Sequence, residues 1–308
     1  MTTTLADPVR LLSDTVDPAR VTVLDAGLST TLQDLGRPGF AHLGVTVSGA
    51  ADRTSLTLAN RLVGNADGAT AFENTFGGLA ITVSTDRYVA VTGATVDIHI
   101  DGRAPTEGRR TLLRAGQVLT LGRPITGLRA YLAVEGGIET EKVFGSAATD
   151  CLSGLGPARV RTGSEFALGT AIHSPPHNVP LELTPPRLPV GAVEVSFRWG
   201  PRETIFTARD RAALTATPWT VSADCDRVGA RLTGPPLSIG SVDLPSEGMA
   251  LGAIQIPPSG EPIVFLADHP VTGGYPVIGV VTERDVDLLA QAAPGIRIRF
   301  TPLRNEDH

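Results

Sequence analysis

Lysine is almost absent from this chain. Of its 26 basic residues, Lys142 is the single lysine and the others are arginines. A P-loop needs a lysine on the phosphates of a nucleotide, and the sequence contains no GxxxxGK[ST] segment. A biotin carrier needs a lysine between methionines, whereas the two methionines are Met1 and Met249. The chain is therefore predicted neither to carry biotin nor to bind ATP through a P-loop, and a partner would have to supply either group.

Several other features that define function classes are also missing. The two cysteines, Cys151 and Cys225, have no metal-like spacing, and the six histidines form no HExxH pair, so no metal site is predicted. The segment GxSxG is absent, which argues against a self-sufficient serine hydrolase. No apolar run approaches the length of a membrane span, and the first residues lack the apolar core of a signal peptide. These absences, with two reduced thiols, indicate a cytoplasmic protein.

Charge gives no sign of a polyanionic partner. The formal net charge is -6 and the pI is about 5.5, so the sequence predicts no binding to nucleic acid or to an anionic membrane. Hydrophobic residues make up 42% of the chain and charged residues 19%, which is typical of a globular protein rather than a disordered one. The 308 residues suffice for two domains.

Strand signals dominate what is present. Short β-rich segments recur between Gly, Asp and Pro turns, at 81–84, 88–93, 96–100, 110–114, 117–122, 128–137, 193–199, 253–257, 263–267 and 296–300. Three helices are predicted, at 52–63, 202–209 and 282–292, the last with Thr282 and Asp285 in capping-box spacing. The sequence thus predicts a mainly β fold of barrels or sandwiches with a few short helices.

A proline-rich segment divides this pattern. Residues 174–189 contain six prolines and are predicted to be an extended connection. The predicted organisation is a flexible extension at 1–20, a first domain at 21–173, a connection at 174–190 and a second domain at 191–302.

The turn Gly273-Gly274-Tyr275-Pro276 is the most informative local feature. Adjacent glycines permit positive φ and let a ligand approach the main chain, and Tyr275 sets an aromatic face and a hydroxyl beside them. Apolar runs at 264–267 and 277–281 flank the turn, which predicts that buried strands hold it. A tight hairpin with a packed tyrosine explains the same residues, and this alternative stays open here.

A second polar set lies among glycines near the start of the chain. An arginine such as Arg37 can bind a carboxylate or phosphate through two parallel hydrogen bonds, and Asp34 could orient it or accept a proton. An internal Asp-Arg pair that braces a loop is the alternative. Ser48 and Asp52 flank the predicted helix start, where they could hold a ligand or simply cap the helix. Further candidates are Gln33 and Glu73 in this half and Ser246, Glu247, Gln255 and Thr272 in the other.

Long motifs in order along the chain carry a family resemblance. They are QDLGRPG, SGAAD followed by ANRLVGN, VTGA, VEGGI, GSAATDCLSGLG, DRVGARL, SEGMALGAIQIPPSGEP and TGGYP. Together they resemble the biotin-dependent carboxyltransferase family, which includes allophanate hydrolase subunit 2, KipA-type proteins, the C subunit of 5-oxoprolinase and part of urea carboxylase. The resemblance runs from about residue 21 to 300. It implies two cyclophilin-like β-barrels.

The resemblance also implies a function. It implies one subunit of a cytoplasmic multi-component hydrolase of amide bonds, inactive alone, paired with a KipI-type subunit 1 and supplied with carboxybiotin or ATP by partners. Opening of 5-oxoproline to glutamate is the first expectation and allophanate hydrolysis in urea breakdown the second. A non-enzymatic KipA-type antagonist of a kinase inhibitor is the alternative.

The site that the resemblance predicts is shared with a partner chain. Its predicted catalytic residues are Asp34, Arg37 and Tyr275. Its predicted substrate-binding residues are Gln33, Ser48, Asp52, Glu73, Ser246, Glu247, Gln255, Thr272, Gly273 and Gly274. The stretch Asp268-His269-Pro270-Val271 before TGGYP is less polar than in the family, which leaves the substrate open.

Overall fold

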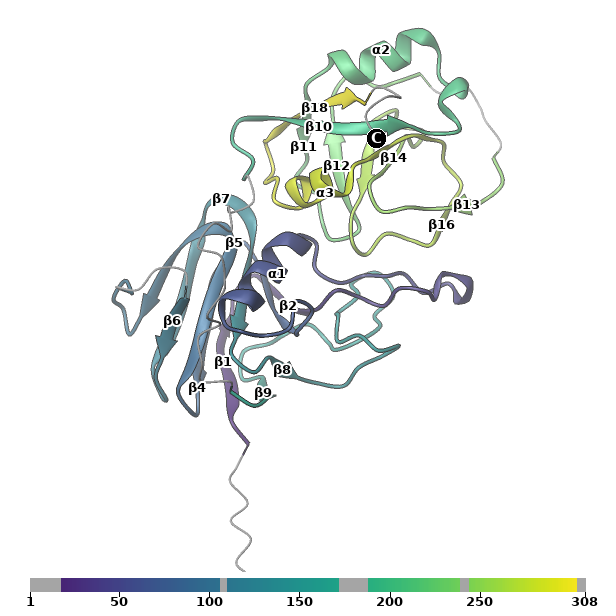
Figure 1. Ribbon diagram of the computed structural model, residues 1–308. Coiled ribbons are helices and arrows are strands. Elements are labelled where there is room, and N and C mark those ends of the chain that lie inside the picture. The colour runs from purple at the N-terminus through teal and green to yellow at the C-terminus, as the bar shows by residue number, and fades with distance from the viewer. Residues whose placement is uncertain (1–17, 106–109, 172–187, 239–243, 304–308) are drawn as a thin grey trace, which may run out of the picture.

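The computed structural model describes residues 18–105, 110–171, 188–238 and 244–303. The predicted fold, mainly β with barrel-like halves and few helices, is confirmed. Figure 1 shows the two halves one above the other, with helices α1 and α3 where they meet. Residues 1–17 of the predicted extension and 174–187 of the proline-rich connection lie outside the described residues, whereas Arg20 begins the first strand. The domain boundaries at 173 and 191 stay a prediction.

The first half is a curled nine-stranded sheet with one helix on it. Its order is β2-β3-β7-β4-β1-β9-β8, with β5 paired to β6 and β7. Two long strands, β5 and β7, pair with each other through several register shifts that bend the sheet. The strands are β1 (Arg20–Ala26), β2 (Ser29–Gln33), β3 (Ala71–Thr75), β4 (Leu79–Val83), β5 (Arg87–Ile100), β6 (Arg110–Leu113), β7 (Val118–Val134), β8 (Ile138–Glu139) and β9 (Glu165–Leu168).

The second half is a closed barrel with two helices. Its strand order is β10-β17-β14-β15-β12-β11-β18, and a parallel β18–β10 pair closes it. A separate two-stranded arm, β13 (Glu247–Gly248) with β16 (Thr272–Gly273), extends from it. The barrel strands are β10 (Ala192–Trp199), β11 (Trp219–Val221), β12 (Gly229–Thr233), β14 (Ala253–Gln255), β15 (Ile263–Phe265), β17 (Val277–Val281) and β18 (Arg297–Pro302).

The helices follow the predicted positions with two differences. Helix α1 (Arg53–Leu62) begins after its N-cap Asp52, as predicted. The second predicted helix is wrong in extent, because a 3-10 turn, η2 (Glu203–Ile205), precedes α2 (Ala208–Ala216), which begins at a Thr207–Asp210 capping box. Helix α3 (Glu283–Ala290) lacks the predicted capping box. Its Asp285 carboxylate instead accepts a hydrogen bond from the Ser196 backbone N–H of β10, at 2.7 Å.

The strands around the Gly273-Gly274 turn pair differently from a hairpin. Strands β15 and β17 do not pair with each other; both flank β14. The chain between them leaves the barrel to form β16 of the arm, and Tyr275 is 50% exposed. The packed-tyrosine hairpin is therefore wrong. Nor is any helix in the described residues long and apolar enough to cross a membrane.

Each half has its own apolar core. Phe197, Trp219 and Phe300 are buried inside the barrel, and Leu32, Phe72 and Leu132 are buried inside the curled sheet. Leu56 and Ala59 of α1 pack on the other face of that sheet, against Tyr131. The apolar contact between halves is small, namely Ala51, Ala267 and Ala290. Polar contacts must therefore hold the halves in register.

The barrel core gives the first testable prediction. Phe197 is fully buried and packs edge-on against Trp199 and Phe300, so Phe197→Ala should lower the free energy of unfolding by about 3–5 kcal/mol. Because Tyr275 is half-exposed, Tyr275→Ala should change the free energy of unfolding by no more than about 1 kcal/mol. Urea unfolding followed by tryptophan fluorescence compares the two. Equal losses would contradict the placement of these rings.

Candidate functional site

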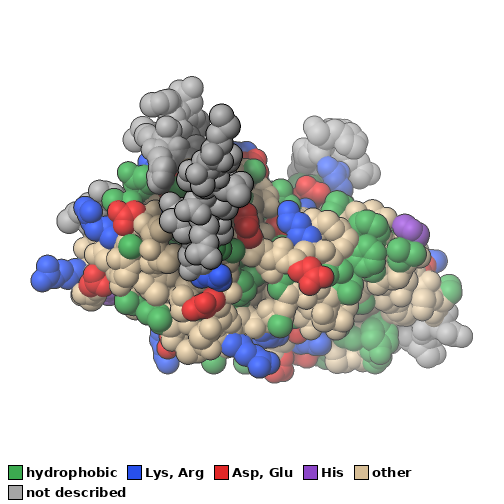
Figure 2. Space-filling model, turned by 90° about the horizontal axis from the view of Figure 1, so that it is seen from below, with side chains coloured by type: hydrophobic (Ala, Val, Ile, Leu, Met, Phe, Trp, Pro, Cys, Tyr) green, Lys and Arg blue, Asp and Glu red, His purple; other side chains and the backbone are tan. Residues whose placement is uncertain are grey.

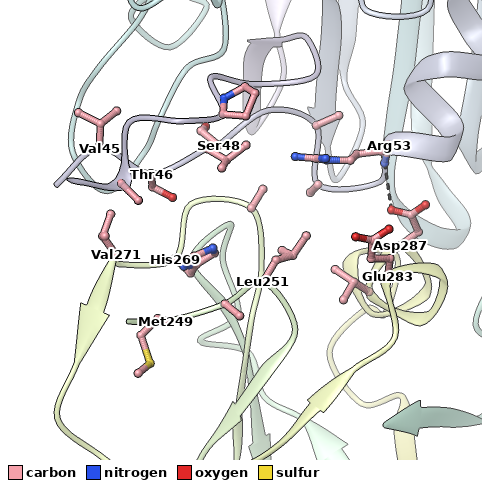
Figure 3. Close-up of a pocket in the computed structure, with 18 of the residues that line it drawn as sticks. Val45, Thr46, Ser48, Arg53, Met249, Leu251, His269, Val271, Glu283 and Asp287 are labelled. Carbon is pink, nitrogen blue, oxygen red and sulfur yellow. Dashed lines mark hydrogen bonds between the residues drawn. The ribbon is translucent and has the colours of Figure 1, made fainter. Parts of the chain in front are cut away.

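A cavity of about 620 Å³ lies between the two halves. The first half contributes the loop that leads to α1, including Val45, Thr46 and Ser48. The second half contributes Met249 and Val271, which adjoin the arm strands, the segment around His269 and the start of α3. Figure 3 shows the two walls facing each other, with Arg53 and Asp287 at one end and Thr46, Ser48 and His269 at the other. Most other lining side chains are apolar, so the cavity is polar only at its ends.

Backbone crossing shapes the first wall. The Arg37 N–H donates to the Val47 carbonyl at 2.8 Å, and the Ala50 N–H donates to the Asp34 carbonyl at 2.9 Å. Gly49 has φ 90°, and a Cβ there would lie 2.7 Å from the Gly36 nitrogen, so only glycine fits. Ser48 itself has φ 53°, in the sparsely populated left-handed region. The crossing thus directs Ser48 toward the second half.

A buried chain of polar groups then crosses the junction. The Ser48 hydroxyl donates to Asp268 at 2.6 Å, and Arg227 donates to both oxygens of Asp268, at 2.9 and 3.0 Å. Arg227 also contacts Glu73 of β3 and donates to the Gly49 carbonyl at 2.5 Å. Glu73 accepts a hydrogen bond from the Tyr131 hydroxyl at 2.8 Å. One arginine thus joins carboxylates from both halves.

Burial and charge act in opposite directions on these groups. Burial by itself would raise the pKa of Asp268, yet the charge and hydrogen bonds of Arg227, with those of Ser48, lower that pKa below its ordinary value. Burial would lower the pKa of Arg227, but Glu73 and Asp268 raise it well above the ordinary arginine value. Burial, together with Glu73 and Asp52, raises the pKa of Tyr131. Arg227 and Asp268 are therefore charged, and Tyr131 remains a neutral donor.

Two aspartates and a glutamine form a second junction. Asp52 accepts hydrogen bonds from the Ser55 N–H at 2.9 Å and from Gln291, the C-cap of α3, at 2.8 Å. Asp287 of α3 accepts from the Arg53 N–H at 3.0 Å and the Thr54 hydroxyl at 2.5 Å. Both carboxylates thus lie at the positive N-terminus of α1. Burial, then the charge of Asp287, raises the pKa of Asp52 to about 6, and burial also raises the pKa of Asp287.

The first predicted cluster lies beneath the cavity loop. Asp34 accepts hydrogen bonds from the Ser146 hydroxyl at 2.6 Å and the Ala147 N–H at 2.7 Å. Arg37 is 1% exposed and donates to the Ala148 carbonyl, while its Nε and Nη1 have no partner among the described residues. Burial lowers the pKa of Arg37. Gln33 donates to the Thr149 carbonyl at 2.9 Å, so all three residues fix the loop at 146–149.

The remaining predicted residues gather on the arm and beside it. Glu247 of β13 pairs with Gly273 of β16, and Gly248 pairs with Thr272. Arg202 makes an ion pair with Glu247, Ser246 and Gly274 are exposed, and the Gln255 amide lies 3.4 Å from the Tyr275 carbonyl. Gln255 and Tyr275 line a second depression, of about 680 Å³, rather than the junction cavity. The structure thus brings together Ser48, Asp52 and Glu73, places Asp34, Arg37 and Gln33 next to them, and keeps the arm residues apart.

Sequence reasoning missed several members of these networks. Arg227 lies in DRVGARL, a motif that contributed to the family resemblance but to no predicted site. Tyr131 lies in an apolar strand, where an aromatic residue indicates packing. Asp268 lies shortly before the glycine turn, but only residues of the turn itself were predicted to belong to the site. Asp287 and Gln291 are on the polar side of α3, and nothing local distinguishes them from solvated residues. The described residues hold no group of three or more His, Cys, Asp or Glu side chains arranged for a metal.

Comparison with known proteins shows the family. Residues 43–302 match the model described as "Carboxyltransferase domain, subdomain A and B". The chain belongs to this carboxyltransferase domain family. The family resemblance that the motifs indicated is thereby confirmed.

Two kinds of relative share the domain. The C subunit of the 5-oxoprolinase of Escherichia coli (strain K12) is 36% identical over 289 residues, with 92% of each chain covered. The urea amidolyase of Saccharomyces cerevisiae is 29% identical over 94% of this chain but over 17% of its own length. A solved structure of the Kluyveromyces lactis urea amidolyase matches with a TM-score of 0.85 at 27% identity, over 93% of this chain and 19% of that one.

A third match has an intermediate length. The solved structure of TTHA0988 has a TM-score of 0.82 at 34% identity, over 92% of this chain and 56% of that one. This carboxyltransferase domain chain therefore spans about half of TTHA0988 and less than a fifth of the urea amidolyases.

The Arg227 network gives the second prediction. Arg227→Met leaves the buried Asp268 without its cation and leaves Glu73 with the more distant Arg129, 3.7 Å away, so the free energy of unfolding should fall by about 3–5 kcal/mol. Arg61→Ala is the matched control, because it breaks the exposed Arg61–Asp67 pair, which is worth about 1 kcal/mol or less. Urea denaturation measures both. Similar losses would show that Arg227 does not hold the junction.

Asp52 gives a prediction on pH. Because the native carboxyl has a pKa of about 6 against an ordinary value of 3.8, the folded chain binds this proton more tightly than the unfolded chain. The stabilisation is complete below the ordinary value and is lost as the pH rises through about 6. Asp52→Asn should therefore flatten the fall of the melting temperature between about pH 4 and pH 6.5. An unchanged pH dependence would contradict the raised pKa.

Proposed function

We propose that this carboxyltransferase domain chain is the C subunit of a 5-oxoprolinase, one component of a multi-component enzyme that cleaves an amide bond. The observation that carries the proposal is the match to the Escherichia coli protein of that name, 36% identical with 92% of both chains covered. A second protein of that name, from Haemophilus influenzae, is 30% identical over 91% of this chain. The reaction is the opening of 5-oxoproline to glutamate.

A second candidate is a role in urea breakdown. The urea amidolyases contain a region 29% identical to this chain, which supports a subunit of allophanate hydrolase. In both candidate functions the substrate is a small molecule with a planar amide group. They differ in the ligand and in the partner subunits.

The proposal includes a partner. In TTHA0988 and in the urea amidolyases the equivalent region is part of a longer chain, so further domains accompany it there. A KipI-type subunit 1 would take that place for this chain. With Lys142 as its single lysine and no P-loop, the chain would receive ATP or carboxybiotin from partner subunits, and it would be inactive alone.

The junction cavity is the proposed site of the amide. It lies between the two halves, and Ser48 opens onto it from a strained backbone held by Asp268. Asp52 and Glu73 would keep the walls in place, since both take part in buried contacts across the junction. Asp34, Arg37 and Gln33 would support the loop from below. Tyr275, Gln255 and the arm, with Ser246, Glu247, Thr272, Gly273 and Gly274, would face the partner.

In Figure 2 hydrophobic side chains lie interspersed with acidic and basic ones on the face that is shown, so no single charge dominates that face. A mixed surface of this kind is compatible with a protein partner and gives no support to a polyanionic one.

Activity of the isolated and assembled protein tests this proposal. The purified chain alone should hydrolyse neither ATP nor allophanate, whereas the chain co-purified with a KipI-type subunit and the remaining subunit should form glutamate from 5-oxoproline with ATP consumed. Tyr275→Phe should lower the activity of the assembled enzyme and leave the melting temperature unchanged, because the ring is half-exposed.

The control and the contrary outcomes separate the candidates. Arg61→Ala, remote from the cavity lining, should assemble and act like the unsubstituted chain. Turnover of allophanate instead of 5-oxoproline would support the second candidate. Stoichiometric binding without turnover of either would overturn both and favour a regulatory KipA-type role.

A further inference from the structure

His269 has a fixed orientation at the polar end of the junction cavity. His269 lies after β15, in the segment that leads to the arm, and is 8% exposed. One face of its ring lies near Phe265, with ring centroids 6.0 Å apart, and its Nδ1 lies 2.8 Å from the Pro270 carbonyl oxygen. In Figure 3 the ring lies across the gap from Thr46 and Ser48. Both a ring contact and a hydrogen bond therefore hold the imidazole in place.

The hydrogen bond decides which nitrogen carries the proton. A carbonyl oxygen only accepts, so Nδ1 must be the donor. In the neutral imidazole Nε2 then has a free lone pair and is an acceptor. Within the described residues no polar atom bonds to Nε2, and the residue lines the cavity. Its unused acceptor is thus available to a ligand.

Thr46 supplies the complementary group. Its hydroxyl is buried and has no hydrogen-bond partner among the described residues, although the side chain lines the same cavity. The neighbouring Ser48 hydroxyl is already committed to Asp268. A buried hydroxyl without a partner is costly, and the unused Nε2 acceptor of His269 opens onto the same cavity. A ligand that offers both a donor and an acceptor would satisfy the hydroxyl and bind Nε2.

We propose that His269 determines the specificity of the junction cavity by accepting a hydrogen bond, through Nε2, from the N–H of an amide, while the Thr46 hydroxyl donates to its carbonyl. This inference rests on the proposed function, since it concerns the same site. The ligand class is an amide with a free N–H, such as a lactam or a ureido group. At this end of the cavity a carboxylate or phosphate is disfavoured, because Nε2 would face another acceptor, whereas Arg53 lies at the opposite end.

A pair of small lactams tests the proposal without any partner. The probes are 2-pyrrolidinone and N-methyl-2-pyrrolidinone, which differ in the N–H. Nitrogen-15 spectra of the histidine side chains in the full chain should show the His269 Nε2 resonance shifting with 2-pyrrolidinone and not with the methylated probe. Equal shifts with both probes, or none with either, would overturn the proposal.

Two substitutions separate recognition from folding. His269→Asn keeps a donor near the Nδ1 position for the Pro270 carbonyl but places no acceptor at the Nε2 position, whereas Thr46→Val keeps the shape and removes the hydroxyl. The unsubstituted chain should prefer the N–H probe by about tenfold or more, and His269→Asn should lose that preference. Thr46→Val should weaken both probes alike. His42→Gln, at an exposed position outside the cavity lining, should behave as the unsubstituted chain.

The assembled enzyme provides the link to the proposed function. His269→Asn should raise the KM for 5-oxoproline by about tenfold or more, while His42→Gln should leave it unchanged. If the unsubstituted complex does not turn over 5-oxoproline but the lactam pair still discriminates at His269, the proposed function fails and the cavity assignment stands. If the unsubstituted complex turns over 5-oxoproline, and the His269→Asn complex has the same KM and the same lactam preference, the role of His269 is wrong and the proposed function stands.

Discussion

The Arg227 guanidinium is the interaction on which the arrangement of the two halves depends. It pairs with two buried carboxylates, Asp268 from its own half and Glu73 from the other, and a second buried arginine, Arg129, lies 3.7 Å from Glu73. Apolar contact between the halves is confined to a few alanines, so packing alone cannot fix their relative position. A buried charge pair is costly to break because each partner left behind is desolvated. The shape of the cavity therefore depends on this network, together with the hydrogen bonds of Asp52 and Asp287 across the junction.

The fold class followed from the sequence because its signal is local. Short β-rich segments between glycine and proline turns indicate barrels whatever their order, and a helix such as α1 is marked by its own N-cap and apolar face. Strand pairing is not local. Runs 264–267 and 277–281 are adjacent in sequence and look like the two strands of a hairpin. In the barrel, however, β14 (residues 253–255) pairs with both and lies between them, and nothing in the sequence of the two runs shows this. Asp285 likewise has capping-box spacing but binds Ser196, a tertiary contact that spacing does not show.

The candidate site was predicted in part for the same reason. Glycine-rich turns mark Asp34, Arg37 and Ser48 as polar residues in a constrained backbone, and all three lie beneath or along one wall of the cavity. The opposite wall comes from residues with no such mark. His269 is an isolated histidine in sequence, and its significance depends on a carbonyl that fixes its tautomer and on a threonine from the other half. Only the folded chain brings these together.

The arm formed by β13 and β16 differs from every other pair of strands in the barrel half. Its strands pair with each other and with no barrel strand, so its length sets no register elsewhere. Insertions, deletions or altered side chains there would leave the seven-stranded closure intact while changing the wall that Met249 and Val271 give to the cavity. The barrel is thus a constant frame, and the arm is the segment through which one ancestor could give rise to enzymes for different amides.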